Sequence, residues 1–190
     1  MSKNFSKLCI CFMVFTIMVL FGATVAAKSI KVDDKAPDFT LKNVAGKEVN
    51  FKNFADKKTV LLYVWYKCCP GCGEEYGPLK GVAREYKGVE TLTVVLHGSQ
   101  KGLADFFDKM NKKPLDILVD PEGKVASLYR IRRIPYLIIV DKNGVVGYMG
   151  SFPGEKELNQ VLDNIVAGKV GKEGEKRSKS KCSPTPSCGH

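Results

Sequence analysis

The segment Thr59–Cys72 reads TVLLYVWYKCCPGC and indicates the fold class. Its first eight residues, Thr59 to Tyr66, are without exception β-branched, aliphatic or aromatic, which is typical of a central strand buried on both faces. The run 70–86 that follows can form a helix with Pro70 in its first turn, where a missing N–H costs least. We expect Pro78 to kink this helix. A buried strand that leads directly into a helix indicates an α/β domain.

Outward from this segment, apolar runs and turn signals predict the other elements. A short hairpin is expected over 39–51, turning at Ala45-Gly46, and a second one around Asp141-Lys142-Asn143-Gly144. The remaining predicted strands are 91–96, 115–119, 136–140 and 145–149, and the remaining predicted helices are 101–110, 122–129 and 155–166. Strands that alternate with helices and then end in a hairpin predict a three-layer α/β sandwich. Its central sheet is mixed, with helices on both faces.

The two ends of the chain differ from this middle part. Residues 1–27 combine Lys3 and Lys7 with an apolar run and small residues at 25–27, the pattern of a secretory signal peptide. Residues 8–27 are also about long enough to serve as an uncleaved membrane anchor. Residues 28–167 form one predicted domain, and 168–190 form a basic tail without apolar periodicity that we expect to be disordered. The predicted location is the periplasm or another compartment outside the cytoplasm.

The net charge of +10 is concentrated at the two ends of the chain. The tail holds six Lys or Arg and two Glu, a net +4, and the predicted domain itself is near +4. Nothing in the domain interleaves basic and aromatic residues as a nucleic-acid surface would. The sequence therefore argues against nucleic acid as a partner.

Cys69 and Cys72 form a Cys-x-x-Cys motif at the predicted strand-to-helix junction. Unpaired backbone N–H groups at a helix N-terminus favour a thiolate, and Lys67 adds a nearby cation. We expect Cys69 to be the exposed nucleophile and Cys72 to resolve the mixed disulfide. A zinc site would need a second such pair in the domain, and haem attachment would need His rather than Gly at position 73. A purely structural disulfide would close too small a ring to stabilise much.

Several motifs lie at matching positions of one family. They are APDFTL at 36–41 with Gly46-Lys47, VLLYVW at 60–65 leading into CPGCGEE at 69–75, VDPEGKVA at 119–126, YRIRRIP at 129–135, and DKNG at 141–144. Over nearly all of 32–166 the chain resembles thioredoxin-fold thiol-disulfide oxidoreductases of the TlpA/ResA/CcmG (DsbE) type, which are related to the AhpC/TSA redoxins.

This resemblance implies a thioredoxin-like fold with an N-terminal hairpin extension. It also implies that Pro135 is a cis-proline packed opposite the cysteine pair, leaving the backbone of Ile134 to pair with an incoming peptide. The implied groove residues are Trp65, Cys68, Pro70, Gly71, Ile134 and Pro135. We expect no metal and no cofactor beyond the redox-active Cys69–Cys72 disulfide. The implied partners are cysteine pairs of exported proteins, with apocytochrome c as a candidate, and a membrane thiol-disulfide electron donor.

Two other functions compete with this one. Peroxiredoxins resemble the chain over 36–41, but they need Thr or Ser three residues before the reactive cysteine, where this chain has Tyr66 before Cys69. A non-catalytic module could instead use the groove for binding alone. It could also carry a metal on the cysteines and on Cys182, Cys188 and His190 of the tail.

The chain departs from the family pattern at the site. Cys68 stands where thioredoxins usually have tryptophan, and it is either a third redox thiol or a tolerated small residue. Tyr63 replaces the buried acid of many thioredoxins, so the acid–base partner of Cys72 is not identified. Arg133 and Tyr136 should make the groove bulkier and more cationic. His97, at the end of a predicted strand, is either a titratable neighbour of the cysteines or an ordinary strand-end residue.

Overall fold

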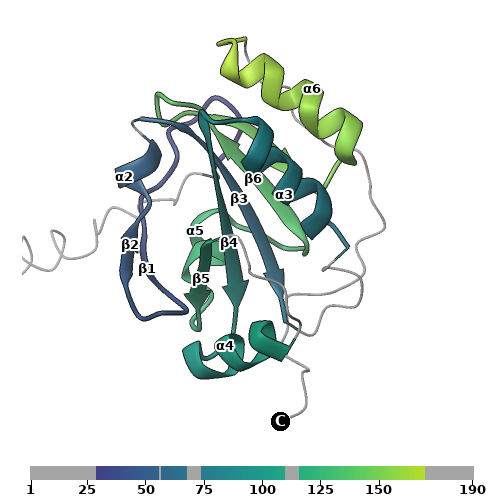
Figure 1. Ribbon diagram of the computed structural model, residues 1–190. Helices are drawn as coiled ribbons and strands as arrows, with labels where there is room; N and C mark the ends of the chain where they lie inside the picture. The colour runs from purple at the N-terminus through teal and green to yellow at the C-terminus, as the bar shows by residue number, and fades with distance from the viewer. Residues whose placement is uncertain (1–28, 56, 68–73, 110–115, 170–190) are drawn as a thin grey trace, which may run out of the picture.

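The computed structural model describes residues 29–55, 57–67, 74–109 and 116–169 (Figure 1). The described part contains a seven-stranded mixed sheet in the order β2-β1-β5-β4-β3-β6-β7. The strands are β1 (Thr40–Asn43), β2 (Glu48–Asn50), β3 (Thr59–Tyr66), β4 (Val89–Leu96), β5 (Asp116–Asp120), β6 (Tyr136–Val140) and β7 (Val146–Gly150). Strands β3, β4 and β5 are parallel, and the remaining pairings are antiparallel. The predicted mixed sheet is confirmed.

Strand β3 is the central strand that its composition predicts. All eight of its residues are buried, and it pairs with β4 on one side and β6 on the other. The parallel pairing with β4 runs in one unbroken register from Thr59–Val89 to Tyr66–Leu96. Since β3 and β4 end at the same edge of the sheet, the segment after Tyr66 leaves the sheet beside the segment after Leu96. Functional residues often gather at such an edge.

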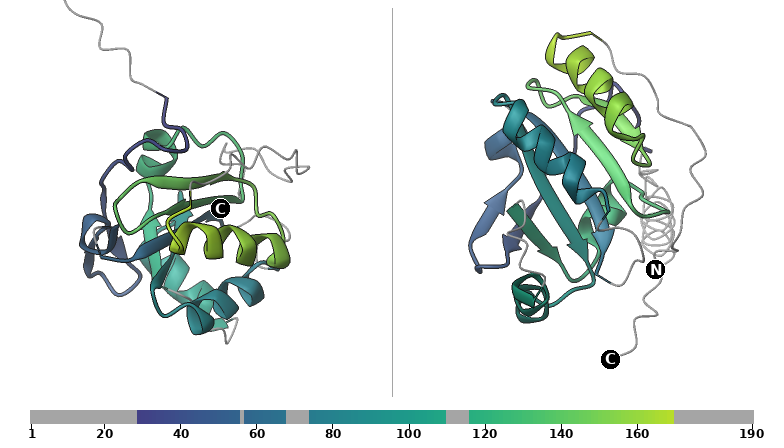
Figure 2. Two further views of the ribbon diagram at one scale, coloured as in Figure 1. Left: turned by 90° about the horizontal axis from the view of Figure 1, so that it is seen from above. Right: turned by 45° about the vertical axis from the view of Figure 1, so that its right-hand side comes forward.

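Helices cover both faces of the sheet. They are α2 (Lys52–Ala55), α3 (Tyr76–Glu85), α4 (Gln100–Lys109), α5 (Lys124–Leu128) and α6 (Glu155–Val166). Helices α3 and α6 lie in front of the strands in Figure 1, whereas α5 lies behind them, and Figure 2 shows the same layers from two other sides. The Tyr86 hydroxyl, just after α3, donates to the Asp163 carboxylate of α6 at 2.9 Å. No helix within the described residues is long and apolar enough to span a membrane.

The predicted N-terminal hairpin is confirmed, and side-chain hydrogen bonds explain its turn. The Asn43 side-chain oxygen accepts the N–H groups of Ala45 at 3.1 Å and Lys47 at 2.9 Å. Gly46 has a φ of +82°, a conformation that a residue with a Cβ rarely adopts. Phe39 and Phe51, on either side of the hairpin, stack with their ring centroids 5.0 Å apart. The hairpin is thereby fastened to the core.

The helix predicted over 70–86 starts later than its sequence suggests. Glu74 and Glu75 lie in a turn and α3 begins at Tyr76, so a helix that runs continuously from Pro70 is wrong. The predicted kink at Pro78 is also unnecessary, because Pro78 now falls in the first turn of α3. An N–H in that turn has no partner within the helix, so proline costs little there.

Helix α5 is likewise shorter than its predicted range of 122–129, and Asp120 explains where it begins. The Asp120 side chain is 1% exposed, and its two oxygens accept the N–H groups of Lys124 and Val125, both at 2.8 Å. These N–H groups belong to the first turn of α5 and have no partner within the helix. Asp120, at the end of β5, therefore determines where α5 starts.

Candidate functional site

The candidate site lies at the edge of the sheet where β3 ends and β6 begins. The Ile134–Pro135 peptide bond is cis, as the family resemblance predicts. In the antiparallel pairing of β3 and β6, Val64 lies opposite Tyr136. Pro135 therefore lies next to the last residues of β3, from which the chain enters the Cys-x-x-Cys segment. Ile134 is fully buried and Pro135 is partly exposed.

The predicted reactive residues themselves, Cys69 and Cys72, lie outside the described residues, as do Cys68, Pro70 and Gly71. The structure describes the residues on either side of them. Lys67 is exposed just after β3, and Glu74 is exposed in the turn before α3. The motif thus connects the end of the central strand to the start of α3. The tail residues Cys182, Cys188 and His190 also lie outside the described residues.

A buried aromatic cluster lies beneath this edge, with Trp65 at its centre. The Trp65 ring has its centroid 5.5 Å from that of Tyr76, 6.2 Å from that of Phe107 and 6.3 Å from that of Tyr63. Only 3% of Trp65 is exposed, which leaves little of the ring for a partner to contact. The sequence predicts Trp65 as a groove residue. In the structure it is a core residue that packs beneath the edge of the sheet carrying the candidate site.

Three polar atoms in and beside this cluster lack a hydrogen bond among the described residues. They are Trp65 Nε1, the Tyr76 hydroxyl and Thr93 Oγ1, all buried. Burial raises the pKa of Tyr76 well above its usual value, and the nearby side chains of Thr93 and Trp65 oppose this rise in part. None of the three atoms reaches hydrogen-bond geometry with another. Buried polar groups usually have a partner, so this pattern marks the core beneath the site as unusually polar.

Tyr63 and Glu75 form a pair that the sequence analysis did not predict. Tyr63 is fully buried in the middle of β3, and its hydroxyl donates to the Glu75 carboxylate. Burial first, and then the charge and hydrogen bond of Glu75, raise the pKa of Tyr63 far above its usual value. The hydroxyl therefore stays protonated. The pair was missed because its members lie twelve residues apart in the sequence and no spacing rule connects them.

Glu75 is the residue at which α3 is capped. It precedes Tyr76 and forms no side-chain capping bond to the helix. Its Oε2 atom is shielded from solvent, although the residue as a whole is partly exposed. The carboxylate therefore points into the fold towards Tyr63 instead of capping the helix. This places a shielded acid three residues after Cys72 in the chain.

Lys67 and His97, which lie at this edge of the sheet, contact different groups. Lys67 Nζ lies 5.8 Å from the centroid of the Phe106 ring of α4, a cation–π contact. His97 follows β4 with a φ of +53°, and its ring centroid lies 5.5 Å from that of Tyr66. His97 Nδ1 is 3.3 Å from the Pro121 carbonyl oxygen. The predicted effects of Lys67 and His97 on the cysteines stay predictions.

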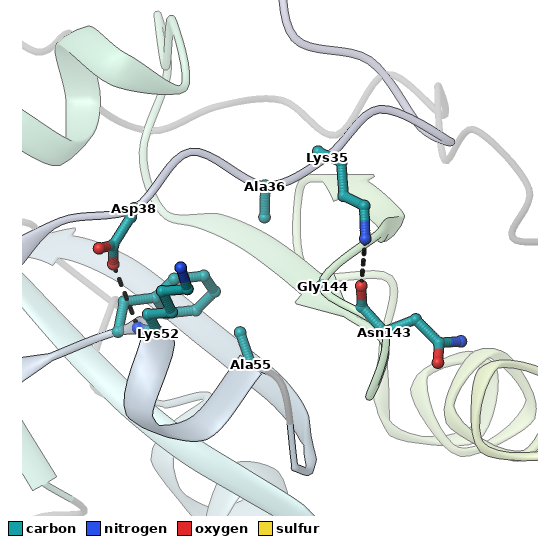
Figure 3. A pocket seen from close by; sticks show the side chains of 8 residues that line it. Lys35, Ala36, Asp38, Lys52, Ala55, Asn143 and Gly144 are labelled. Atoms are coloured by element: carbon teal, nitrogen blue, oxygen red, sulfur yellow. Dashed lines mark hydrogen bonds between the residues drawn. The ribbon is translucent and has the colours of Figure 1, made fainter.

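A separate hollow of about 390 Å³ lies at the opposite end of the sheet (Figure 3). Lys35 Nζ donates across it to the Asn143 carbonyl at 2.6 Å, and Asp38 accepts the N–H groups of Phe39 and Lys52 at 2.8 and 3.1 Å. These polar groups connect the N-terminal segment to α2 and to the turn between β6 and β7. They serve the fold, and we assign no function to the hollow. Among the described residues no cluster of His, Cys, Asp and Glu could hold a metal ion.

The sheet order, the helices on both faces and the cis-proline beside the end of the central strand define a protein of the thioredoxin-fold class. The AhpC/TSA family model matches residues 32–149. The chain belongs to the AhpC/TSA family.

Individual relatives agree with this assignment. The chain is 30% identical over 142 residues to thioredoxin-like protein YneN of Bacillus subtilis, covering 70% of this chain and 80% of that one. It is 30% identical over 125 residues to thiol-disulfide oxidoreductase ResA of Oceanobacillus iheyensis, covering 63% and 64%. A Chlorobium tepidum protein crystallised as a DsbE-type thiol:disulfide interchange protein aligns with a TM-score of 0.65 and 25% identity. That alignment covers 72% of this chain and 99% of the other.

Peroxiredoxins are also among the similar proteins. Chloroplastic peroxiredoxin Q of Triticum aestivum is 27% identical over 138 residues, covering 68% of this chain and 64% of the relative. The relatives and the solved structure named above as thiol-disulfide oxidoreductases or interchange proteins match this chain in sequence and in fold. The chain is therefore an oxidoreductase that exchanges thiols and disulfides.

Proposed function

We propose that this protein is an exported thiol-disulfide oxidoreductase that reduces disulfides in other exported proteins through Cys69 and Cys72. One observation carries the proposal: the cis-Pro135 segment at the start of β6 lies beside the end of β3, and the Cys-x-x-Cys segment continues directly from β3. A partner strand that pairs with the backbone at Ile134 would bring its disulfide to the cysteine pair.

The proposed reaction has two steps. The Cys69 thiolate attacks one sulfur of the partner disulfide, the partner S–S bond breaks, and the released partner thiolate takes up a proton. The Cys72 thiolate then attacks the Cys69 sulfur and releases the second partner thiolate. The partner gains two electrons, and the chain ends with a Cys69–Cys72 disulfide. A membrane thiol-disulfide donor must then return the two electrons for another turnover.

Glu75 is our candidate for the proton-handling group at Cys72. Three peptide units separate the two residues, so their Cα atoms are at most about 11 Å apart. The Tyr63 hydroxyl, which donates to Glu75, would hold the carboxylate in place. This assigns Tyr63 a positioning role at the place where many thioredoxins have a buried acid.

The location and the partners belong to the same proposal. Residues 1–27 have the pattern of an export signal, with 8–27 as an alternative anchor, and an exported compartment allows disulfides to persist. Cysteine pairs of exported proteins are the proposed substrates, and apocytochrome c is one candidate. The resemblance to the TlpA/ResA/CcmG type is our reason for proposing reduction as the direction of electron flow.

Trapping experiments test the reaction directly. With Cys72→Ser, the second step is blocked, so mixed disulfides between Cys69 and partner proteins should accumulate. With Cys69→Ser they should be absent. Non-reducing electrophoresis followed by mass spectrometry measures both. A binding module without turnover would trap nothing through Cys69, and a metal carrier would copurify with stoichiometric metal that is lost in Cys69→Ser. Either result would contradict the proposal.

The reduction potential of the cysteine pair decides the direction of electron flow. A reductant should have a potential close to that of thioredoxin, about −270 mV, whereas an oxidant should be near that of DsbA, about −120 mV. Equilibration of the full chain with glutathione or dithiothreitol buffers, followed by alkylation, measures it. A potential near the DsbA value would overturn the assignment as a reductant.

Peroxidase activity is the second candidate, because peroxiredoxin Q is among the relatives. Tyr66 occupies the position three residues before Cys69 where peroxiredoxins need Thr or Ser, and its side chain is 6% exposed and packed against His97. A buried tyrosine cannot supply that hydroxyl to a peroxide bound at Cys69. We therefore expect the reduced chain to consume hydrogen peroxide no faster than a simple thiol does.

A further inference from the structure

Two arginines lie directly before the cis-proline segment. Arg132 and Arg133 are both exposed, and they immediately precede Ile134–Pro135. Within the residues that the structure describes, neither side chain forms a hydrogen bond or an ion pair. Two lysines already have partners: Lys58 is paired with Glu90 at 2.8 Å, and Lys35 donates to Asn143. The positive charges of the two arginines are therefore available to pair with acidic groups of a partner.

The strand register places these arginines near the cysteine segment. Val64 and Tyr136 form the last pair of the β3–β6 register, and Lys67 lies three residues after Val64 whereas Arg133 lies three residues before Tyr136. Paired strands lie about 5 Å apart, and arginine side chains span a comparable distance. Lys67 itself is exposed and lies over the Phe106 ring. We call Lys67, Arg132 and Arg133 the cationic rim.

Acidic residues of the chain neutralise the positive charge of the cationic rim only in part. Glu74 is exposed on the other side of the cysteine segment, beyond Cys72. Glu75 receives the Tyr63 hydroxyl and has one oxygen shielded from solvent. Arg130 adds a further positive charge, although it already interacts within the fold. The rim before Pro135 is therefore cationic at the place where a partner strand would pass.

We propose that the protein prefers partners whose reactive cysteine is flanked by acidic side chains, which the cationic rim recognises. This inference rests on the proposed function and narrows its substrate class. Arginine binds carboxylates in a bidentate manner, and charge complementarity steers encounters and repels the wrong partners. A cysteine flanked by lysines would meet like charges at Lys67, Arg132 and Arg133.

Two disulfide-bridged peptides that differ only in their charged residues test this preference. One carries glutamates on both sides of the cysteine and the other carries lysines at the same positions. The reduced full chain should reduce the acidic peptide about 2- to 10-fold faster at low salt, because each exposed ion pair contributes modestly. At 0.5 M salt the ratio should approach one, because the charges are then screened. Stopped-flow fluorescence of the single tryptophan follows the reaction.

Variants of the two arginines test whether the cationic rim causes the difference in reduction rate between the two peptides. The double variant Arg132→Ser and Arg133→Ser should bring the ratio of the two rates close to one. Arg84→Ser is the matched control, since Arg84 is exposed in the last turn of α3, far from the site, and its loss should leave the ratio unchanged. Equal rates for both peptides with the unaltered chain would overturn the inference, as would faster reduction of the basic peptide or an unchanged ratio in the double variant.

The same rate measurement, with a neutral disulfide as a third substrate, distinguishes failure of this inference from failure of the proposed function. Hydroxyethyl disulfide, a neutral small disulfide, should be reduced at the same rate by the unaltered chain and by the Arg84→Ser control. If the chain reduces neither peptide nor this compound, the proposed function fails and the inference fails with it. If it reduces all three and does not discriminate between the peptides, only the acidic preference fails.

Discussion

Tyr63 and Glu75 form the most unusual contact described at the candidate site. A fully buried tyrosine donates to a carboxylate that lies in the turn before α3, and nearby polar atoms of Trp65, Tyr76 and Thr93 are buried without hydrogen bonds among the described residues. Polar groups in a core destabilise the fold unless they are satisfied, so their gathering beneath a reactive motif suggests a functional reason. The pair could hold or move a proton for Cys72.

Replacing Tyr63 tests this role. Tyr63→Phe removes the hydroxyl, so the Glu75 carboxylate loses the hydrogen bond that this hydroxyl donates. We expect a loss of about 1–3 kcal/mol in the free energy of unfolding, because a hydrogen bond to a charged group is lost. We also expect a shift in the pH profile of disulfide exchange. Urea unfolding measures the first effect, and the rate of peptide reduction between pH 5 and 9 measures the second.

Tyr86→Phe is the matched control for Tyr63→Phe. The Tyr86 hydroxyl also donates to a carboxylate, that of Asp163, but at the opposite end of α3. Its loss should lower stability without moving the pH profile. If both variants leave the pH profile in place, Tyr63 has only a structural role. Glu75→Gln should then also leave the profile unchanged.

At the scale of elements, short polar segments determine where the helices begin. Helix α3 starts after Glu75, and α5 starts where Asp120 receives two backbone N–H groups. Both starts lie at the edge of the sheet that carries the candidate site. The position of α5 therefore depends on a carboxylate as well as on its apolar face.

Asp120→Ala should disturb α5 and the residues that follow it towards Pro135. The change leaves two N–H groups in the first turn of α5 without their acceptor, so we expect a loss of about 2–3 kcal/mol in the free energy of unfolding. Chemical denaturation measures this loss. Asp116→Ala is the control, because Asp116 is exposed at the start of β5, and it should change stability by less than about 0.5 kcal/mol. Equal effects for the two variants would refute the capping role of Asp120.

At the scale of the whole molecule, several buried tyrosines couple stability to alkaline pH. Burial raises the pKa values of Tyr63, Tyr76, Tyr129 and Tyr148, and that of Tyr148 rises from 10.0 to about 12. A phenol whose pKa is higher in the folded state stabilises the fold fully below pH 10. This contribution is lost as the pH rises from 10 through 12. The folded protein should therefore become steadily less stable across this range.

Tyr148→Phe isolates one of these contributions. Tyr148 is 3% exposed, and its hydroxyl donates to the Ser151 carbonyl at 2.7 Å. A pKa raised from 10.0 to about 12 corresponds to about 2–3 kcal/mol. The variant should lose less stability than the unaltered chain between pH 9.5 and 11.5, as measured by urea midpoints at each pH. Identical slopes for the two proteins would contradict the raised pKa of Tyr148.

Local patterns in the sequence were enough to predict most of the sheet and its helices. The apolar run 59–66, the Asn-Gly turn of 141–144 and the amphipathic stretch 155–166 correspond to β3, the β6–β7 turn and α6. Each depends on the periodicity or turn chemistry of adjacent residues, which a sequence displays directly. The cis bond before Pro135 came from a family resemblance rather than from such a pattern.

The sequence by itself determined that a Cys-x-x-Cys motif follows a buried central strand, because both features are local. Only the tertiary structure decided which distant groups surround that motif. It brought Glu75 to Tyr63 and placed the cis-Pro135 segment beside the end of β3 through the β3–β6 pairing. It also moved the start of α3 to Tyr76. The physical reason is that these contacts depend on strand register and helix packing, which bring together residues far apart in the chain.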